Sequence, residues 1–131
     1  MRRKKLLDTY ALLVYLRKES KFEEVKDLLS SKDVLLLMNE INVGETFYIL
    51  ARERGMDKAD YFINTILPNL PITHRANTFE DVLGAARIKA EYPLSYADCF
   101  ATQTAVKEEA SLVTGDPEFK KVEKIVQIDW L

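Results

Sequence analysis

The sequence predicts an α/β fold of three layers, in which a mainly parallel sheet of four to five strands is covered by helices on both faces. Two observations predict it. Short apolar runs alternate with stretches of helical spacing along the 131 residues, and no turn signal such as Asn-Gly joins neighbouring runs into a hairpin. Parallel strands need long crossover connections, so this alternation indicates βα units. We expect a single domain over residues 1–131, which is long enough to bury a core.

The first half of the chain predicts two strands, each followed by helices. Residues 4–7 are a short strand candidate, and from Thr9 the leucines take helical spacing, so Asp8 lies at a strand-to-helix junction. The run 33–38, DVLLLM, is typical of a strand that is buried on both faces. The expected helices begin at residue 9 and near residue 22, cover residues 40–54 between an Asn39 N-cap and Gly55, and cover residues 57–67.

The second half adds shorter strands. A brief strand is expected at residues 72–73, and the runs 111–114 and 125–128 close the chain as strands around a helical turn near Glu118. The expected helices cover residues 78–90, with Thr78 and Asp81 in capping-box spacing, and begin again at Ser95 after Pro93. Ligands of parallel sheets bind at the carboxyl ends of the strands, so the residues that follow each strand are the candidates for function.

Composition excludes several classes of protein. The net charge of −2 and a pI near 5.5 argue against a strongly basic nucleic-acid coat, although they neither propose nor exclude RNA. With one cysteine and one histidine, the chain offers no intrachain disulfide, no Cys/His zinc cluster and no pair of catalytic histidines. We expect a cytoplasmic protein without a membrane span, because Asp8 interrupts the signal-like start and no apolar run approaches about 20 residues.

Two acids directly follow predicted strands. Asp8 comes after the first strand and Asp116 after the run 111–114. Taken alone, Asp8 is most simply a helix N-cap and Asp116 most simply an Asx turn before Pro117.

Two further acids lie in early turns of predicted helices. Glu45 shares a helix face with Ile41 and Tyr48, so we expect it among apolar neighbours, where an unpaired carboxylate is costly. Asp98 follows Ser95 by three residues and could complete a capping box, but it also borders a stripe of alanines suited to packing on a sheet.

All four acids are therefore expected at one edge of the sheet. At about 4 Å and an effective dielectric constant near 20, two carboxylates repel each other by about 4 kcal/mol, so a shared pocket needs protons or cations. Carboxylate oxygens without histidine or cysteine favour Mg²⁺ or Mn²⁺ over zinc.

The segments LLDTYALLVYL, NVGETFYIL, LSYADCFATQTA and LVTGDPEF, in this order, resemble the PIN-domain ribonucleases, and most closely the VapC toxins of toxin–antitoxin pairs. The resemblance extends over essentially the whole chain. It implies a metal-dependent endoribonuclease that holds one or two Mg²⁺ or Mn²⁺ ions, leaves 5′-phosphate and 3′-hydroxyl products, forms homodimers and is inhibited by a cognate antitoxin. The matching acids are Asp8, Glu45, Asp98 and Asp116, with Thr9 and Thr114 in supporting positions.

The expected mechanism assigns a role to each acid. Asp8 and Asp116 would be direct ligands of the main ion, Asp98 would contact the same ion or its waters, and Glu45 would orient the attacking water. A basic rim for RNA is expected at Lys120 and Lys121, close in sequence to Asp116. The chain departs from the family at position 10, where many relatives carry Ser or Asn and this sequence has Tyr10.

Other functions remain open at this stage. A phosphoacceptor receiver domain would need paired acids near the first strand, and a haloacid dehalogenase-type phosphatase would need an acid at position 10, where the chain has Tyr10. A PIN fold that serves only as a binding module is disfavoured by the retained acids. A toxin and an RNA-processing nuclease without an antitoxin would share the same chemistry, and the sequence does not separate them.

Overall fold

A five-stranded sheet, parallel throughout, forms the centre of the computed structural model, which describes residues 2–131. The strand order is β3-β2-β1-β4-β5. The fold class predicted from the sequence is confirmed. The strands are β1 (Arg3–Leu7), β2 (Val34–Asn39), β3 (Ile72–Arg75), β4 (Ser111–Thr114) and β5 (Ile128–Trp130).

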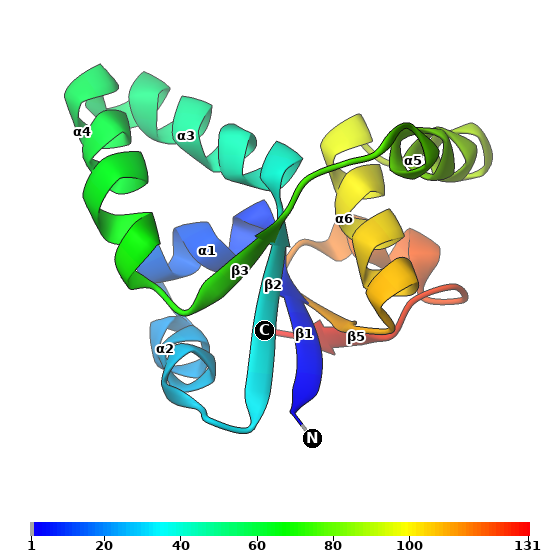
Figure 1. The fold of residues 1–131 in the computed structure, drawn as a ribbon, viewed down its shortest axis with the longest axis horizontal. Coiled ribbons are helices and arrows are strands. Elements are labelled where there is room, and N and C mark those ends of the chain that lie inside the picture. Colours follow the sequence, from blue (N-terminus) through cyan, green and yellow to red (C-terminus); the bar gives the residue numbers. More distant parts are fainter. Residues whose placement is uncertain (1) are drawn as a thin grey trace.

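Helices cover both faces of this sheet (Figure 1). One face carries α1 to α4 and the turns that follow α4, and the other carries α5, α6 and the turn η3. Within the described residues, no helix is long and apolar enough to cross a membrane. The helices are α1 (Thr9–Leu16), α2 (Phe22–Ser30), α3 (Glu40–Arg54), α4 (Met56–Tyr61), α5 (Phe79–Glu91) and α6 (Tyr96–Glu108), with short turns η1 (Phe62–Ile66), η2 (Leu67–Asn69) and η3 (Pro117–Val122).

The pleat of the central strands sends alternate side chains into two separate cores. Leu7 and Leu36 pack with α1 to α4, whereas Leu6 and Leu37 pack with α5, α6 and η3, and all four are almost fully buried. Burial on both faces explains why β2 is an apolar run from Val34 to Met38, whereas β1 is apolar only at Leu6 and Leu7, where it is fully buried.

The strand order places a topological switch point between β1 and β4. From β1 the chain proceeds outward through β2 and β3 on one side, and it returns to place β4 and then β5 on the other side. Ligands of open parallel sheets bind at the carboxyl edge beside such a switch point. Asp8 and Asp116 follow the two strands that flank it.

Most predicted elements are found within a residue or two, and three differ. The helix expected over 57–67 ends at Tyr61 and continues as a π-turn over Phe62–Ile66, in which the Leu67 N–H bonds to the Phe62 carbonyl. This wider turn brings Phe62 and Leu67, five residues apart, onto the same buried side. The third strand is longer than predicted because all four of its residues pair with β2. The last strand is not 125–128 but Ile128–Trp130, because residues 123–126 complete the turn after η3.

Candidate acid site

The four candidate acids lie at the carboxyl edge of the sheet. Asp8 joins β1 to α1, Asp116 follows β4, and Glu45 lies in the second turn of α3, which starts directly after β2. Asp98 lies in the first turn of α6. This helix runs against the strands and ends beside the amino end of β4, so its first turn lies at the same edge as the other acids.

Asp8 is a buried carboxyl with two hydrogen bonds. One oxygen, Oδ1, accepts the Ala11 N–H at 2.8 Å and caps α1, which confirms the N-cap prediction. The other oxygen, Oδ2, accepts the Thr114 hydroxyl at 2.5 Å. Burial raises the pKa of Asp8 to about 8, repulsion from Asp98 and Asp116 adds to this rise, and the two hydrogen bonds oppose it.

Thr114 links the ends of the two switch-point strands. Its buried hydroxyl donates to Asp8 and accepts the Asp116 N–H at 3.0 Å. Asp116 in turn accepts the Glu118 N–H at 3.0 Å, which forms the predicted Asx turn. One threonine thus fixes the relative position of the segments that carry Asp8 and Asp116.

Asp98 faces the other acids. Burial raises its pKa to about 6, a hydrogen bond with Ser95 opposes the rise, and Asp116, Glu45 and Glu118 add repulsion. The full capping box forms at Thr78 and Asp81, as predicted. In the described chain, Ser95 makes only half of one, accepting the Asp98 N–H at 3.2 Å.

Glu45 is held by Thr9 and is less buried than expected. The Thr9 hydroxyl donates to Glu45 Oε1 at 2.5 Å. The expected apolar surroundings are wrong in part, because Ile41 and Tyr48 on the same helix face are 42% and 45% exposed. Glu45 therefore lies at an open edge of the site, where its carboxylate is stabilised by a hydroxyl donor.

The acids repel one another, yet none has a basic partner. None of the ion pairs among residues 2–131 includes Asp8, Glu45, Asp98 or Asp116. The crowding expected from the sequence is weaker than predicted, because no three acidic, histidine or cysteine side chains of these residues converge closely enough to form a metal group. The four side chains nevertheless offer only carboxylate oxygens, the ligand type that suits a hard divalent cation.

Comparison with known proteins identifies the family. Residues 5–125 match the family model of the PIN domain. The chain belongs to the PIN-domain family. VapC20 of Mycobacterium tuberculosis, described as a sarcin-ricin loop cleaving toxin, has a TM-score of 0.76 at 17% identity, covering 95% of this chain and 98% of that chain.

Two further solved structures share this PIN fold. VapBC2 from Rickettsia felis, bound to a DNA fragment from its promoter, has a TM-score of 0.75 at 15% identity and covers 98% of both chains. FitAcB from Neisseria gonorrhoeae has a TM-score of 0.68 at 22% identity, covering 95% of this chain and 96% of that chain. No curated protein sequence matches this PIN domain.

The lysines expected to bind RNA differ in their surroundings in this PIN domain. The Lys121 ammonium pairs with the Glu118 carboxylate and donates to the Pro93 carbonyl at 3.1 Å. Lys120 is exposed and has no acidic partner among residues 2–131. RNA binding by these two lysines stays a prediction, and Lys120 is the one whose charge is not already matched.

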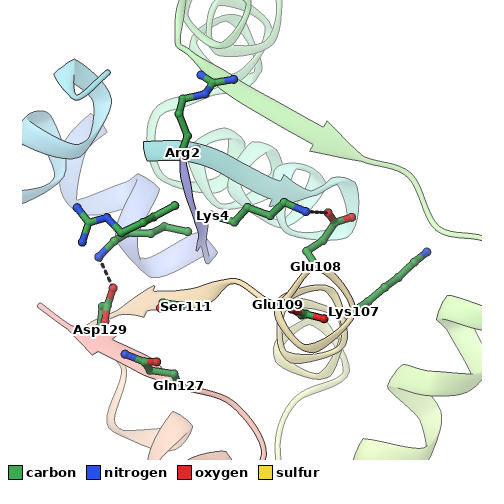
Figure 2. A pocket seen from close by; sticks show the side chains of 10 residues that line it. Arg2, Lys4, Lys107, Glu108, Glu109, Ser111, Gln127 and Asp129 are labelled. Atoms are coloured by element: carbon green, nitrogen blue, oxygen red, sulfur yellow. Dashed lines mark hydrogen bonds and ion pairs between the residues drawn. The ribbon is translucent and has the colours of Figure 1, made fainter. Parts of the chain in front are cut away.

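The basic run at the start of the chain lies at the opposite edge of the sheet. It lines a cavity of about 770 Å³ at the amino ends of β1 and β4 (Figure 2). Its inner lysines are matched by acids, because Lys4 pairs with Glu108 at 3.4 Å and Lys5 pairs with Asp129. Figure 2 shows Arg2 pointing away from the Lys4–Glu108 contact. This cavity is therefore separate from the acid site, and two of its lysines are already paired with acids.

Sequence reasoning missed two polar residues near the acids. Asn42 is fully buried, and its amide donates to the carbonyl of Ala97, the residue before Asp98, at 3.1 Å. Glu118 raises the pKa of Asp98. In the sequence, only their spacing from the acids could have indicated them. Asn42 precedes Glu45 by one helical turn, and Glu118 follows Asp116 by two residues.

Tyr10 packs against Gly115. A Cβ atom on Gly115 would lie 2.4 Å from Tyr10 Cε1, so the ring occupies the space of the missing side chain. We expect Gly115→Ala to displace the ring and cost about 1 kcal/mol of unfolding free energy, and to cost much less in a Tyr10→Ala background. Urea unfolding of the four proteins measures this coupling. Equal costs in both backgrounds would show that the ring does not constrain position 115.

Proposed function

We propose that this PIN domain is a metal-dependent endoribonuclease that hydrolyses RNA phosphodiester bonds with water. The observation that carries the proposal is the set of four acids, brought from four separate segments to the switch-point edge without a basic partner. Membership of the PIN family supports a nuclease, and a fold shared with a toxin that cleaves the sarcin-ricin loop supports RNA as the substrate.

Each acid has a role that follows from its contacts. Asp8, Asp98 and Asp116 would hold one or two Mg²⁺ or Mn²⁺ ions, and a bound ion supplies a nucleophilic hydroxide near neutral pH and stabilises charge on the phosphoryl oxygens. Thr114 keeps Asp8 and the Asp116 main chain at a fixed separation. Glu45, aligned by the Thr9 hydroxyl, would orient the attacking water and accept its proton at Oε2, since Oε1 is engaged.

Cleavage of structured RNAs in Mg²⁺, in Mn²⁺ and in excess EDTA tests the chemistry. We expect cleavage with either ion and its loss, to the level of the buffer control, under chelation, because the site holds no histidine and no basic group that could replace the cation. Restoring the ion should restore cleavage. Continued cleavage under chelation would refute the proposed mechanism.

We further propose that the protein is the toxin of a toxin–antitoxin pair, that it is inhibited by a cognate antitoxin and that it forms homodimers. Supporting this, the solved structures that share its fold include VapBC from Salmonella typhimurium and a toxin-antitoxin complex from Klebsiella pneumoniae. Expression should arrest growth, and co-expression of the antitoxin should relieve the arrest. Undisturbed growth with an active nuclease would favour an RNA-processing enzyme.

A further inference from the structure

Asn42 carries an unsatisfied polar atom in the interior of the protein. Its side chain is fully buried, and the amide nitrogen donates to the Ala97 carbonyl at 3.1 Å. The amide oxygen, Oδ1, has no hydrogen-bond partner among residues 2–131. Exchanging the two amide atoms would set Oδ1 against the Ala97 oxygen, so the orientation is fixed by chemistry. A buried acceptor without a donor destabilises a fold, because the hydrogen bond to water that it loses on burial is not replaced.

A second buried asparagine at this edge of the sheet, Asn39, has hydrogen bonds on both amide atoms. Asn39 is also fully buried, and its Oδ1 accepts from Ile41 N–H at 2.8 Å and from Asn77 at 3.0 Å. Its Nδ2 donates to Asn77 and to Thr104, each at 2.7 Å. A fully paired amide three residues earlier makes the unpaired oxygen of Asn42 a specific feature that needs a donor from outside the protein.

Asn42 also lies between segments that carry the acids. It precedes Glu45 by three residues, on the same side of α3. The carbonyl that it binds belongs to the residue before Asp98, so Asn42 ties α3 to the first turn of α6. The Thr9 hydroxyl, which donates to Glu45, lies 3.2 Å from the Asn42 main-chain oxygen. Through its side-chain amide and its main-chain oxygen, Asn42 thus borders the segments of three of the four acids.

We infer that Asn42 is a positioning residue of the acid site: Nδ2 sets the place of Asp98 by binding the Ala97 carbonyl, and Oδ1 accepts a hydrogen bond from a water that belongs to the site. The role of this water rests on the proposed function, in which it would solvate the bound cation and the substrate. Residues that orient the ligands and waters of a metal typically change metal affinity or activity by about 10- to 100-fold when they are removed.

Asn42→Ala tests this role, with Thr46→Val as the matched control. Thr46 is equally buried and donates to the Asn42 carbonyl at 2.8 Å, so its loss removes one hydrogen bond of the same helix without touching the amide. We expect Asn42→Ala to weaken Mn²⁺ binding, measured by titration calorimetry, by about 10-fold or more and to lower kcat with little change in KM. Thr46→Val should bind Mn²⁺ within about 2-fold of the unmodified protein. Equal Mn²⁺ affinity in Asn42→Ala and the unmodified protein would overturn the positioning role.

A second variant separates the two atoms of the amide. Asn42→Asp keeps an oxygen acceptor but loses the donor to Ala97, so we expect kcat to stay reduced, as in Asn42→Ala. Full kcat in this variant would overturn the Ala97 link. A crystal structure of the unmodified protein tests the water directly: density for a water on Oδ1 supports the inference, and a dry Oδ1 overturns it. Failure of the unmodified protein to bind Mn²⁺ would instead overturn the proposed function, so the two failures are distinguishable.

Discussion

Replacing Asp8 by asparagine is expected to reduce RNA cleavage by about 10³-fold or more while leaving the fold intact. The asparagine amide can keep both hydrogen bonds, since its oxygen accepts from Ala11 and its nitrogen donates to the Thr114 oxygen. What it removes is the carboxylate that would bind the ion. Single-turnover cleavage of a labelled RNA in Mg²⁺ measures the loss, and unchanged cleavage would refute the assignment of Asp8.

The same substitution is expected to stabilise the metal-free protein. The folded-state pKa of Asp8 is about 8, well above its ordinary value of 3.8, so between these values the folded protein keeps a proton that the unfolded chain releases. The stability that protonation of Asp8 provides is complete below pH 3.8 and is lost as the pH rises through 8. Asparagine is neutral at every pH, and its advantage therefore grows from pH 4 to pH 8.

Thermal unfolding in EDTA measures this effect. We expect the midpoint of Asp8→Asn to exceed that of the unmodified protein by several degrees at pH 8 and to approach it near pH 4. Asp33→Asn, at an exposed turn, is the control and should shift the midpoint little at either pH. A lower midpoint for Asp8→Asn at pH 8 would show that the charged carboxylate does not destabilise the metal-free folded protein.

Thr114→Val should have the second largest effect. Valine has nearly the shape of threonine, but it removes both the donor to Asp8 and the acceptor of the Asp116 N–H. We expect a loss of about 1–3 kcal/mol in unfolding free energy and a fall in cleavage of about 10- to 100-fold. Thr114→Ser keeps the hydroxyl and should retain most of the activity. Equal activity in the two variants would mean that the hydroxyl does not position the acids.

Much of this fold could be predicted because its signals are local. The apolar run of β2 and the caps at Asn39 and Gly55 mark their elements within a few residues. Asp8 and Asp116 could also be placed, because a residue that directly follows a parallel strand must lie at the carboxyl edge.

Other features depend on which segments meet, so the sequence could not reveal them. The π-turn at Phe62 follows from two distant core positions that must face the same way. The openness around Glu45 depends on what covers Ile41 and Tyr48, and the pairing of Lys121 with Glu118 depends on the geometry of η3. Asn42 is an ordinary helical residue in the sequence, and only its packing against α6 gives it a role.

The hydrogen bond from Thr114 to Asp8 joins residues that are 106 positions apart, across the two strands at the middle of the sheet. Closing so long a loop is slow, because contacts that form at the same time must offset its entropic cost. If the proposed acid site carries the activity, a chain in which β4 has not yet docked beside β1 lacks the pairing of Asp8 with the Asp116 segment, and we expect no cleavage from such a folding intermediate.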